Sequence, residues 1–138
     1  MSSRGLLFVP AFFLPGLLLP LGPLIAGEFP TELVLVVREK QVLAFSSRGN
    51  RWVARDLMAQ EVVEESRKSS HIAVVVTNIR VLGFSADTDQ WDEERLEAGE
   101  RAISLEIDGK VASVVTNVRA LGFGARSGTW SVLRLPLR

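Results

Sequence analysis

The sequence is poor in the residues that usually carry out chemistry. The 138-residue chain contains no cysteine and no tyrosine, and its single histidine is His71. The absence of cysteine excludes disulfides, thiolate chemistry, cysteine-based zinc sites and an anchor attached through cysteine. Basic and acidic residues number 16 each, so no global positive field is present to attract nucleic acid. We therefore expect a non-catalytic protein with no cofactor, no bound metal and no nucleic-acid partner.

Two groups of residues are the remaining candidates for chemistry. A Ser-His-Asp triad would have to use His71, with the serines that precede it; the alternative is a polar residue at the edge of a strand. Asp87, Asp89 and Asp92 are spaced as in part of a calcium loop, but the loop's glycine and distal glutamate are missing. A hydrolase is therefore the least favoured hypothesis.

A sequence unit occurs three times with a spacing of 39 residues. Each copy carries phenylalanine, tryptophan and leucine at matching positions, namely Phe45, Phe84 and Phe123; Trp52, Trp91 and Trp130; and Leu57, Leu96 and Leu135. The second and third copies, 72–96 and 111–135, are identical at 13 of 25 positions, and the first copy, 33–57, matches them less closely. A fixed period of this size indicates a repeat architecture in which each unit buries its apolar face against the next.

Each copy predicts β structure, because β-branched and aromatic residues cluster in short runs separated by turn-forming residues. The strands expected around the third copy are 101–107, 111–116, 119–124 and 129–135, with a tight turn at Asp108-Gly109. The hairpin loops expected in the three copies are 47–50, 87–89 and 126–128. Residues 56–68 and 91–101 are rich in helix formers, but the repeat spacing predicts strands there, including a fourth strand of the first copy within 58–68.

Some predicted strands are apolar at consecutive positions. Residues 33–37, 72–76 and 114–115 do not alternate between apolar and polar side chains. A strand with one face in water should alternate. These runs therefore predict strands that are covered on both faces, as in sheets stacked face to face around an axis.

The repeated sequence resembles a known structural unit. The pattern Val-Val-Thr-Asn-x-Arg-x-Leu-Gly-Phe-x-Ala, followed by tryptophan, resembles the four-stranded blade of a β-propeller. It is loosely similar to the blades of quinoprotein-type propellers at residues 86–91 and 125–130, although Thr88 and Ser127 occupy the motif's aspartate position. The resemblance covers residues 33–135 at the level of single blades and implies no quinone cofactor.

Two all-β folds are consistent with three such copies. A partial propeller would be completed by self-association into a six-bladed ring or by another chain, because complete propellers have about four to eight blades. In that arrangement the third copy lacks a fourth strand after Leu135, and a strand from near Glu28 would supply it. The alternative is a β-trefoil, in which three four-stranded units close without help. The apolar runs and the blade-like pattern favour the propeller.

An uncharged segment precedes the repeats. Residues 5–27 contain no charged side chain and resemble a secretory signal or a membrane-inserting segment, although Pro10, Pro15, Pro20 and Pro23 disfavour a straight helix. We expect residues 1–27 to form a leader or anchor, with an ordinary first strand as the other alternative, and residues 28–138 to form the β domain. This organisation predicts an exported or membrane-associated protein of the periplasm or cell envelope.

The repeated polar and aromatic residues suggest two functions. Tryptophans at symmetry-related positions can stack on sugar rings while nearby polar groups bind hydroxyls. The candidate ligand-binding residues are Trp52, Trp91, Trp130, Arg80, Arg119, Asn78 and Asn117. Their alternative roles are packing in the core and forming turns. We favour an interaction or assembly module that binds a protein partner or itself, with a lectin-like carbohydrate-binding domain as the alternative.

Overall fold

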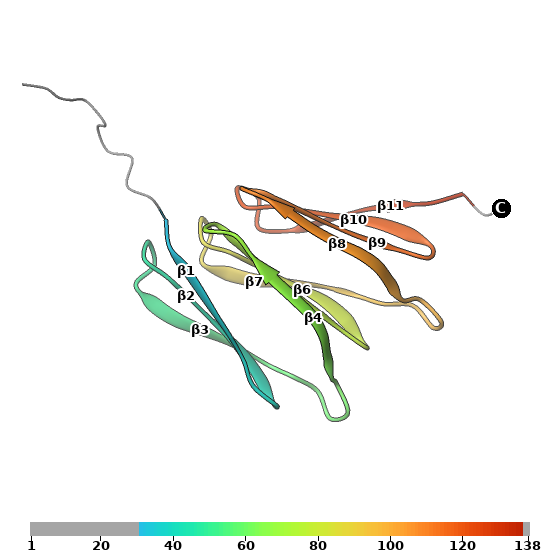
Figure 1. Cartoon of the computed structure of the whole chain (residues 1–138), viewed down its shortest axis with the longest axis horizontal. Helices are drawn as coiled ribbons and strands as arrows, with labels where there is room; N and C mark the ends of the chain where they lie inside the picture. Colours follow the sequence, from blue (N-terminus) through green and yellow to red (C-terminus); the bar gives the residue numbers. More distant parts are fainter. Residues whose placement is uncertain (1–30, 137–138) are drawn as a thin grey trace, which may run out of the picture. The chain divides into compact units, whose positions relative to one another are not determined.

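Every regular element in the described part of the chain is a β-strand. The computed structural model describes residues 31–136, and no helix occurs among them (Figure 1). The strands are β1 (Leu33–Val37), β2 (Gln41–Ser46), β3 (Arg51–Asp56), β4 (Val63–Lys68), β5 (Ile72–Thr77), β6 (Arg80–Ser85), β7 (Gln90–Arg95), β8 (Ala102–Asp108), β9 (Val111–Thr116), β10 (Arg119–Gly124) and β11 (Trp130–Arg134). The strands predicted for the third copy are confirmed, two of them to the residue.

The strands form three separate antiparallel sheets. The first sheet has the order β1-β2-β3, the middle sheet β4-β5-β6-β7 and the last sheet β11-β10-β9-β8. Within residues 31–136, every strand pairs with its neighbour in sequence, and no sheet closes on itself. The predicted all-β class with tandem antiparallel repeats is therefore confirmed.

The strand between two copies belongs to the copy that follows it. The ambiguous segment 56–68 contains β4, which pairs with β5 across the turn closed by the Ser69 N to Ile72 O hydrogen bond of 2.8 Å. The short turn brings β4 alongside β5, whereas a longer linker separates β4 from β3. The prediction that residues 58–68 hold the fourth strand of the first copy is therefore wrong in its pairing.

The last sheet is consequently complete. It contains β8 to β11, so the prediction that the third copy lacks a strand is also wrong. In the described residues it is the first sheet that has three strands. The positions one repeat before β4 are residues 24–29. These positions, the strand predicted near Glu28 and the leader at residues 1–27 all lie outside the described residues.

The predicted hairpin loops share one backbone geometry. Asn50, Asp89 and Gly128 lie one repeat apart, and their φ angles are 53°, 60° and 68°. This left-handed region is accessible to glycine at no steric cost and is tolerated by asparagine and aspartate. The three residues at this position therefore belong to the few types that adopt this conformation readily.

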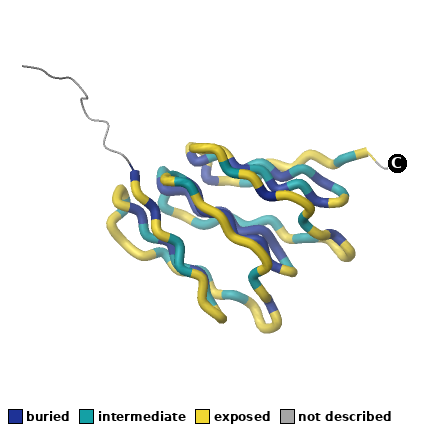
Figure 2. The backbone as a smooth tube through the Cα atoms, viewed as in Figure 1, coloured by how far each residue is buried: buried dark blue, intermediate teal, exposed yellow. Residues whose placement is uncertain are grey.

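The middle sheet is packed between the other two. Every residue of β5 and β6 is buried, whereas β2, β9 and β10 alternate between more and less buried positions (Figure 2). The predicted cover on both faces is thus confirmed for residues 72–76. Within one chain, residues 33–37 and 114–115 are covered on one face, because they belong to the end sheets and no further sheet lies over them within the described residues.

The middle and last sheets each pack a phenylalanine against the preceding sheet. Phe123 of β10 lies against Gly83 of β6, where an added Cβ atom would be 2.8 Å from the aromatic ring. One repeat earlier, Phe84 packs in a buried cluster with Ala44 of β2 and Ala73 of β5. The small residues at positions 44 and 83 make the space into which these rings fit, so the interface between sheets has a repeated geometry.

This packing predicts that a methyl group at Gly83 destabilises the fold. Gly83→Ala would push against the ring of Phe123, and overpacking of this kind costs about 1–3 kcal/mol. Gly122 occupies the same position in the last sheet, where an added Cβ meets no atom within 4 Å. Gly122→Ala should therefore leave the free energy of unfolding unchanged or raise it by up to about 1 kcal/mol. Urea denaturation of both variants at high dilution, where each chain unfolds on its own, measures the difference; equal effects would contradict the described packing.

Candidate functional site

Each sheet carries a phenylalanine paired with a tryptophan on the neighbouring strand. The ring centroids are 5.2 Å apart for Phe45 and Trp52, 5.3 Å for Phe84 and Trp91, and 5.0 Å for Phe123 and Trp130. Such tilted aromatic pairs stabilise by about 0.5–1.5 kcal/mol beyond the area they bury. The three pairs are equivalent within their own sheets, so differences between them arise from what lies on top of them.

Two of the three tryptophans contact the preceding sheet. Nε1 of Trp91 donates a hydrogen bond of 3.0 Å to the carbonyl oxygen of Val53, and Nε1 of Trp130 donates one of 3.2 Å to that of Asp92. Both rings are partly buried. These bonds join β7 to the first sheet and β11 to the middle sheet. Trp91 and Trp130 therefore contribute to the internal interfaces.

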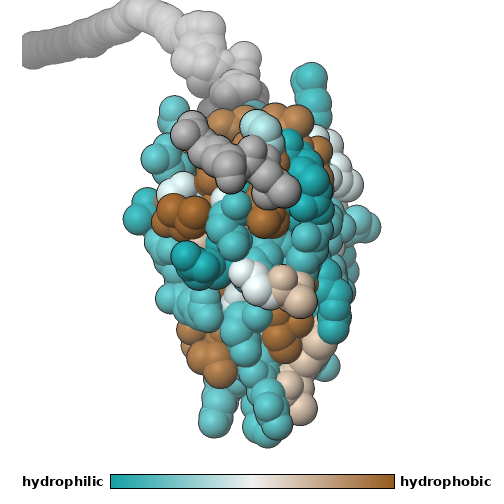
Figure 3. Space-filling view, turned by 90° about the vertical axis from the view of Figure 1, so that its right-hand side faces the viewer, coloured by the Kyte–Doolittle hydropathy of each residue, from teal (hydrophilic) through white to brown (hydrophobic). Residues whose placement is uncertain are grey.

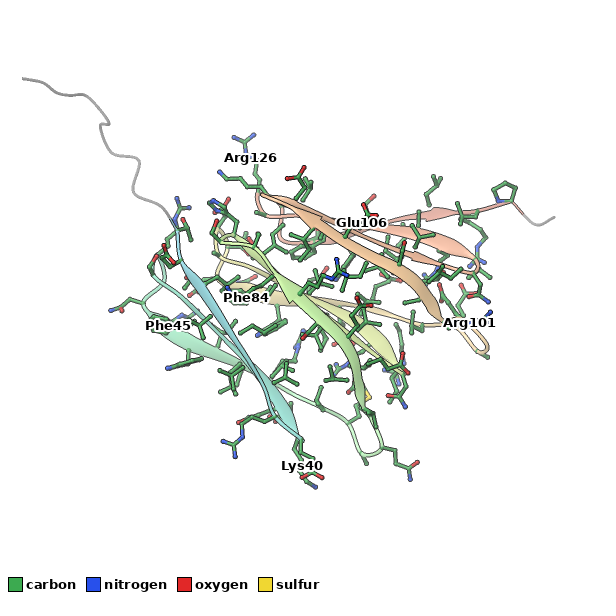
Figure 4. The ribbon with its side chains drawn as sticks, in the orientation of Figure 1. Lys40, Phe45, Phe84, Arg101, Glu106 and Arg126 are labelled. Carbon is green, nitrogen blue, oxygen red and sulfur yellow. The ribbon has the colours of Figure 1, made fainter. Side chains whose placement is uncertain are left out.

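Trp52 has no such interface. Its side chain is 53% exposed, and its Nε1 makes no hydrogen bond to any residue within 31–136. Its partner Phe45 lies in the same sheet on β2 and is drawn with Phe84 in Figure 4. Among the described residues, no preceding sheet therefore covers the first aromatic pair on the side where the other two pairs meet one.

Trp52 is part of an apolar surface at one end of the stack. The strand registers place Val34 opposite Phe45, Phe45 opposite Trp52, and Val36 opposite Leu43, so all five share one face of the first sheet. The opposite face of this sheet packs on the middle sheet through Leu33 and Ala44, among others. We call the open surface formed by Val34, Val36, Leu43, Phe45 and Trp52 the first end face.

The last sheet has a second open surface. Val115 lies opposite Ala120, Ala120 opposite Leu133, and Val111 opposite Gly124 next to Gly122. Val111 is 58% exposed and Leu133 66% exposed. We call the surface formed by Val111, Val115, Ala120, Gly122 and Leu133 the last end face. This face corresponds to the face of the middle sheet against which Phe123 packs, shifted by one repeat.

Exposed hydrophobic residues elsewhere are scattered. Met58, Val62 and Ile103 are exposed on the linkers and on an edge strand. On the side of the molecule shown in Figure 3, hydrophobic residues lie in separate patches among hydrophilic ones. Single exposed apolar residues are common in soluble domains, whereas a contiguous apolar surface marks an interaction site. The two end faces are therefore the stronger candidates.

Candidate ligand residue Arg119 lies in a buried ion-pair network. Its guanidinium donates from Nε to Glu100 Oε2 at 2.9 Å and from Nη2 to Glu100 Oε1 at 2.8 Å. Glu94 accepts a third bond at 3.0 Å, and Thr116 Oγ1 donates to Glu100 Oε2 at 2.6 Å. The side chain of Glu100 is fully buried. A bidentate pair of this kind connects the linker before β8 to the start of β10.

Arg80 repeats this network one unit earlier. It binds Glu61 through Nε at 2.9 Å and through Nη2 at 3.0 Å, and Thr77 Oγ1 donates to Glu61 at 2.7 Å. The first copy has Gln41 at the arginine position. The sequence predicts the two arginines as candidates but not Glu61 and Glu100. The two glutamates lie one repeat apart, each 19 residues before its arginine, and this spacing is the signal that identifies them.

The network controls the ionisation of its carboxylates. Burial alone would raise the pKa of Glu100, but hydrogen bonds from Arg119, Thr116 and the Glu97 amide outweigh it and lower the pKa to about 2. The pKa of Glu61 is likewise lowered, because Arg80, the Met58 amide and Thr77 together outweigh the effect of burial. Both carboxylates are therefore charged and fully paired at neutral pH.

The candidate asparagines form turns. The Asn78 carboxamide accepts from Val62 N at 2.7 Å and donates to Gln60 O at 3.1 Å. Asn117 makes the equivalent bonds to Arg101 N and Gly99 O. These contacts, like those of the arginines, connect each linker to the sheet that follows. The seven candidate residues are thus distributed over three sheets and do not converge on one surface.

Of the groups considered for catalysis or metal binding, Ser69 and Asp87 have structural partners. Ser69 Oγ donates to Gly109 O at 2.6 Å and accepts from the His71 and Ile72 amides, while Nδ1 of His71 lies 3.8 Å from Asp87. Asp87 pairs with Arg48 at 3.3 Å. Over residues 31–136, no cluster of three or more histidine, aspartate or glutamate side chains is arranged to hold a metal ion.

An open groove of about 750 Å³ lies between the β1–β2 turn and the linker at 57–63. It is lined by Val37, Lys40, Met58 and their sequence neighbours, with Lys40 visible at the turn in Figure 4. None of the three tryptophans lines this groove.

Comparisons with protein-family models and with curated proteins find no match to this sequence.

The lowered pKa of Glu100 predicts a loss of stability in acid. Because its folded pKa is about 2 and its ordinary value is 4.5, the ionised carboxylate stabilises the fold above pH 4.5, and this contribution disappears as the pH falls from 4.5 towards 2. A difference of this size corresponds to about 3 kcal/mol. Glu100→Gln should lower the free energy of unfolding at pH 7 and flatten its dependence on pH in this window.

Urea denaturation at pH 7, 4.5 and 3 measures this effect. The exposed Glu106 on β8 provides the control (Figure 4), and Glu106→Gln should change stability by less than about 0.5 kcal/mol. A Glu100→Gln variant with the pH dependence of the unaltered protein would contradict the role assigned to the network.

Proposed function

We propose that this protein is a non-catalytic assembly module of the cell envelope or of a membrane-associated complex. It consists of part of a β-propeller, three blades in length, and its two end faces bind protein. The observation that carries this proposal is the exposure, at both ends of the stack, of apolar surfaces whose counterparts inside the stack are buried.

The sheet arrangement supports a propeller over a β-trefoil. Each sheet is formed from one continuous segment, and within residues 31–136 no strand pairs with a strand of another sheet. Corresponding strands of successive sheets lie next to each other, as β4 lies beside β8 and β7 beside β11. Face-to-face stacking of such four-stranded units is the blade arrangement of a propeller.

The end faces support a binding role over a purely structural one. In the internal interfaces, Phe84, Phe123 and the tryptophans beside them are covered by the neighbouring sheet. The first end face presents the same two residue types to solvent, and Trp52 is 53% exposed. Exposing such a surface costs free energy unless a partner covers it.

The apolar segment at residues 5–27 supports export or membrane association. Within residues 31–136 no helix is present that could span a membrane. Cell fractionation of the native host, combined with the mass of the mature chain, tests this part of the proposal. A full-length chain found only in the cytosol would contradict it, whereas cleavage after the apolar segment or recovery with membranes would support it.

The exposed ring of Trp52 favours carbohydrate binding as the second candidate function. An exposed indole can stack on a sugar ring, and Gln41 and Asp56 of the same sheet offer polar groups. Binding on a glycan array that Trp52→Ala abolishes and Trp91→Ala spares would support this function. Absence of binding on a broad array would remove it.

The assembly function predicts site-specific cross-linking inside cells. A photo-reactive amino acid in place of Trp52 or Leu133 should yield covalent protein adducts, because each position lies on an end face. The same amino acid in place of the exposed Lys40, in the β1–β2 turn, is the control and should yield few (Figure 4). Mass spectrometry identifies the adducts. Equal cross-linking at all three positions, or none at the end faces, would contradict the proposal.

A further inference from the structure

We propose that the partner of each end face is a second copy of this chain. The first end face of one copy docks on the last end face of the other, and two copies arranged head to tail form a closed ring of six sheets. This inference rests on the proposed assembly function and identifies its partner.

The internal interfaces supply the template for this contact. Phe84 packs against Ala44, and Phe123 packs against Gly83, so each phenylalanine fits a small residue of the preceding sheet. Continuing the repeat by one step places Phe45 of one copy over Gly122 of the other. Gly122 has no atom within 4 Å of an added Cβ, so the space that Phe123 fills at Gly83 is empty there.

The same shift of one repeat predicts a tryptophan hydrogen bond between the two copies. Trp91 donates to the carbonyl of Val53 and Trp130 to that of Asp92, in each case 38 residues earlier. The corresponding acceptor for Trp52 is the carbonyl of Ser131 on the second copy. Docking would thus provide a partner for an indole N–H that has none within residues 31–136.

The ion pair between the middle and last sheets has no charged counterpart at the end faces. Inside the stack, Glu94 on the middle sheet pairs with Arg119 at 3.0 Å. The counterparts at the end faces are Leu133 and Gln41, so both members of the ion pair are replaced by uncharged residues. Burying one charge without its partner is strongly unfavourable. The paired replacement avoids this cost and leaves an apolar contact.

One pair of like charges at the edge of the proposed contact opposes docking. Arg48 pairs with Asp87 at 3.3 Å inside the stack, and the counterparts at the end faces are Arg126 and Arg48. The contact therefore brings together two arginines in solvent-exposed hairpin loops. Arg126→Asp would restore the opposite charges of the internal pair, so it should tighten association of two copies about two- to fivefold at low salt.

A contact between different faces either closes into a ring or continues as a filament. Two copies of three sheets give six, which lies within the range of about four to eight blades found in closed propellers. A ring of two leaves neither end face exposed, so the assembly should stop at the dimer.

Disulfide trapping in the full chain tests the contact directly, because the natural sequence contains no cysteine. In the internal interface, an added Cβ at Gly128 lies 3.2 Å from the Cβ of Thr88. The corresponding pair between copies is Ser127 and Asn50, and Cβ atoms separated by about 3.5–4.5 Å can form a disulfide. Mixing Asn50→Cys chains with Ser127→Cys chains under mild oxidation should give a covalent dimer.

The matched control uses the opposite end of the last sheet. Arg101→Cys places an exposed thiol there, far from Ser127 in the sequence and at the other end of β8 from the Arg126 loop (Figure 4). A mixture of Asn50→Cys with Arg101→Cys should give at least tenfold less covalent dimer than the mixture with Ser127→Cys. Equal yields from the two mixtures, or no covalent dimer from either, would overturn the inference.

A second variant separates docking from folding. Gly122→Leu would fill the space that Phe45 is proposed to occupy, and the chain should still fold because no atom lies within 4 Å of an added Cβ. Its circular dichroism should be unchanged, while its dissociation constant by sedimentation should rise at least tenfold. A monomer at all concentrations, an unlimited polymer, or a dimer insensitive to both Gly122→Leu and Arg126→Asp would overturn the inference.

The two proposals fail in different ways. If the adducts formed at the end faces in cells contain only other proteins, the assembly function stands and the choice of a second copy is overturned. Absence of any end-face adduct, with no association of purified chains, would overturn both.

Discussion

Face-to-face packing of one sheet on the next is the interaction on which this structure depends. The middle sheet has apolar side chains on both faces, so it is stable only while it is covered on both sides. Ile72, Val74 and Val76 face the last sheet, whereas Ala73 and Val75 face the first. A single repeat has no means of burying these surfaces alone, which is the general property of repeat proteins. Each end sheet therefore has one apolar face that no further sheet of the described residues covers.

The sequence predicts the elements well because their signals are local. Runs of valine and positions such as Asn50 and Gly128 define strands and turns within a few residues, so the strand bounds and hairpins could be predicted. The predicted pairing of β4 is wrong although the signal for the correct pairing is local, because a short turn at residues 69–71 joins β4 to β5 as the Asp108-Gly109 turn joins β8 to β9. Glu61 and Glu100 could not be predicted in this way, because a charged residue in a linker is expected to be exposed unless the distant arginine that pairs with it is known.

The departures from perfect repetition occur where the stack ends. The first copy lacks the Thr-Asn-x-Arg motif and has Gln41 at the arginine position, and the last copy has Ser131 and Leu133 where the middle copy has Asp92 and Glu94. Inside the stack these acidic residues bind Trp130 and Arg119 of the next sheet. Their absence at the ends removes charges that only an internal neighbour would satisfy, and the aromatic pair of the first copy is retained. This pattern is the physical basis for proposing that the end faces meet each other.

Hydrogen exchange of the three indole N–H groups, followed by NMR at concentrations where the chain associates, tests the central claim most directly. The account predicts that the Nε1 proton of Trp52 is protected to the same degree as those of Trp91 and Trp130, which are hydrogen-bonded between sheets. Rapid exchange of the Trp52 proton at every concentration, beside protected Trp91 and Trp130, would show that the first end face stays open and would contradict the account.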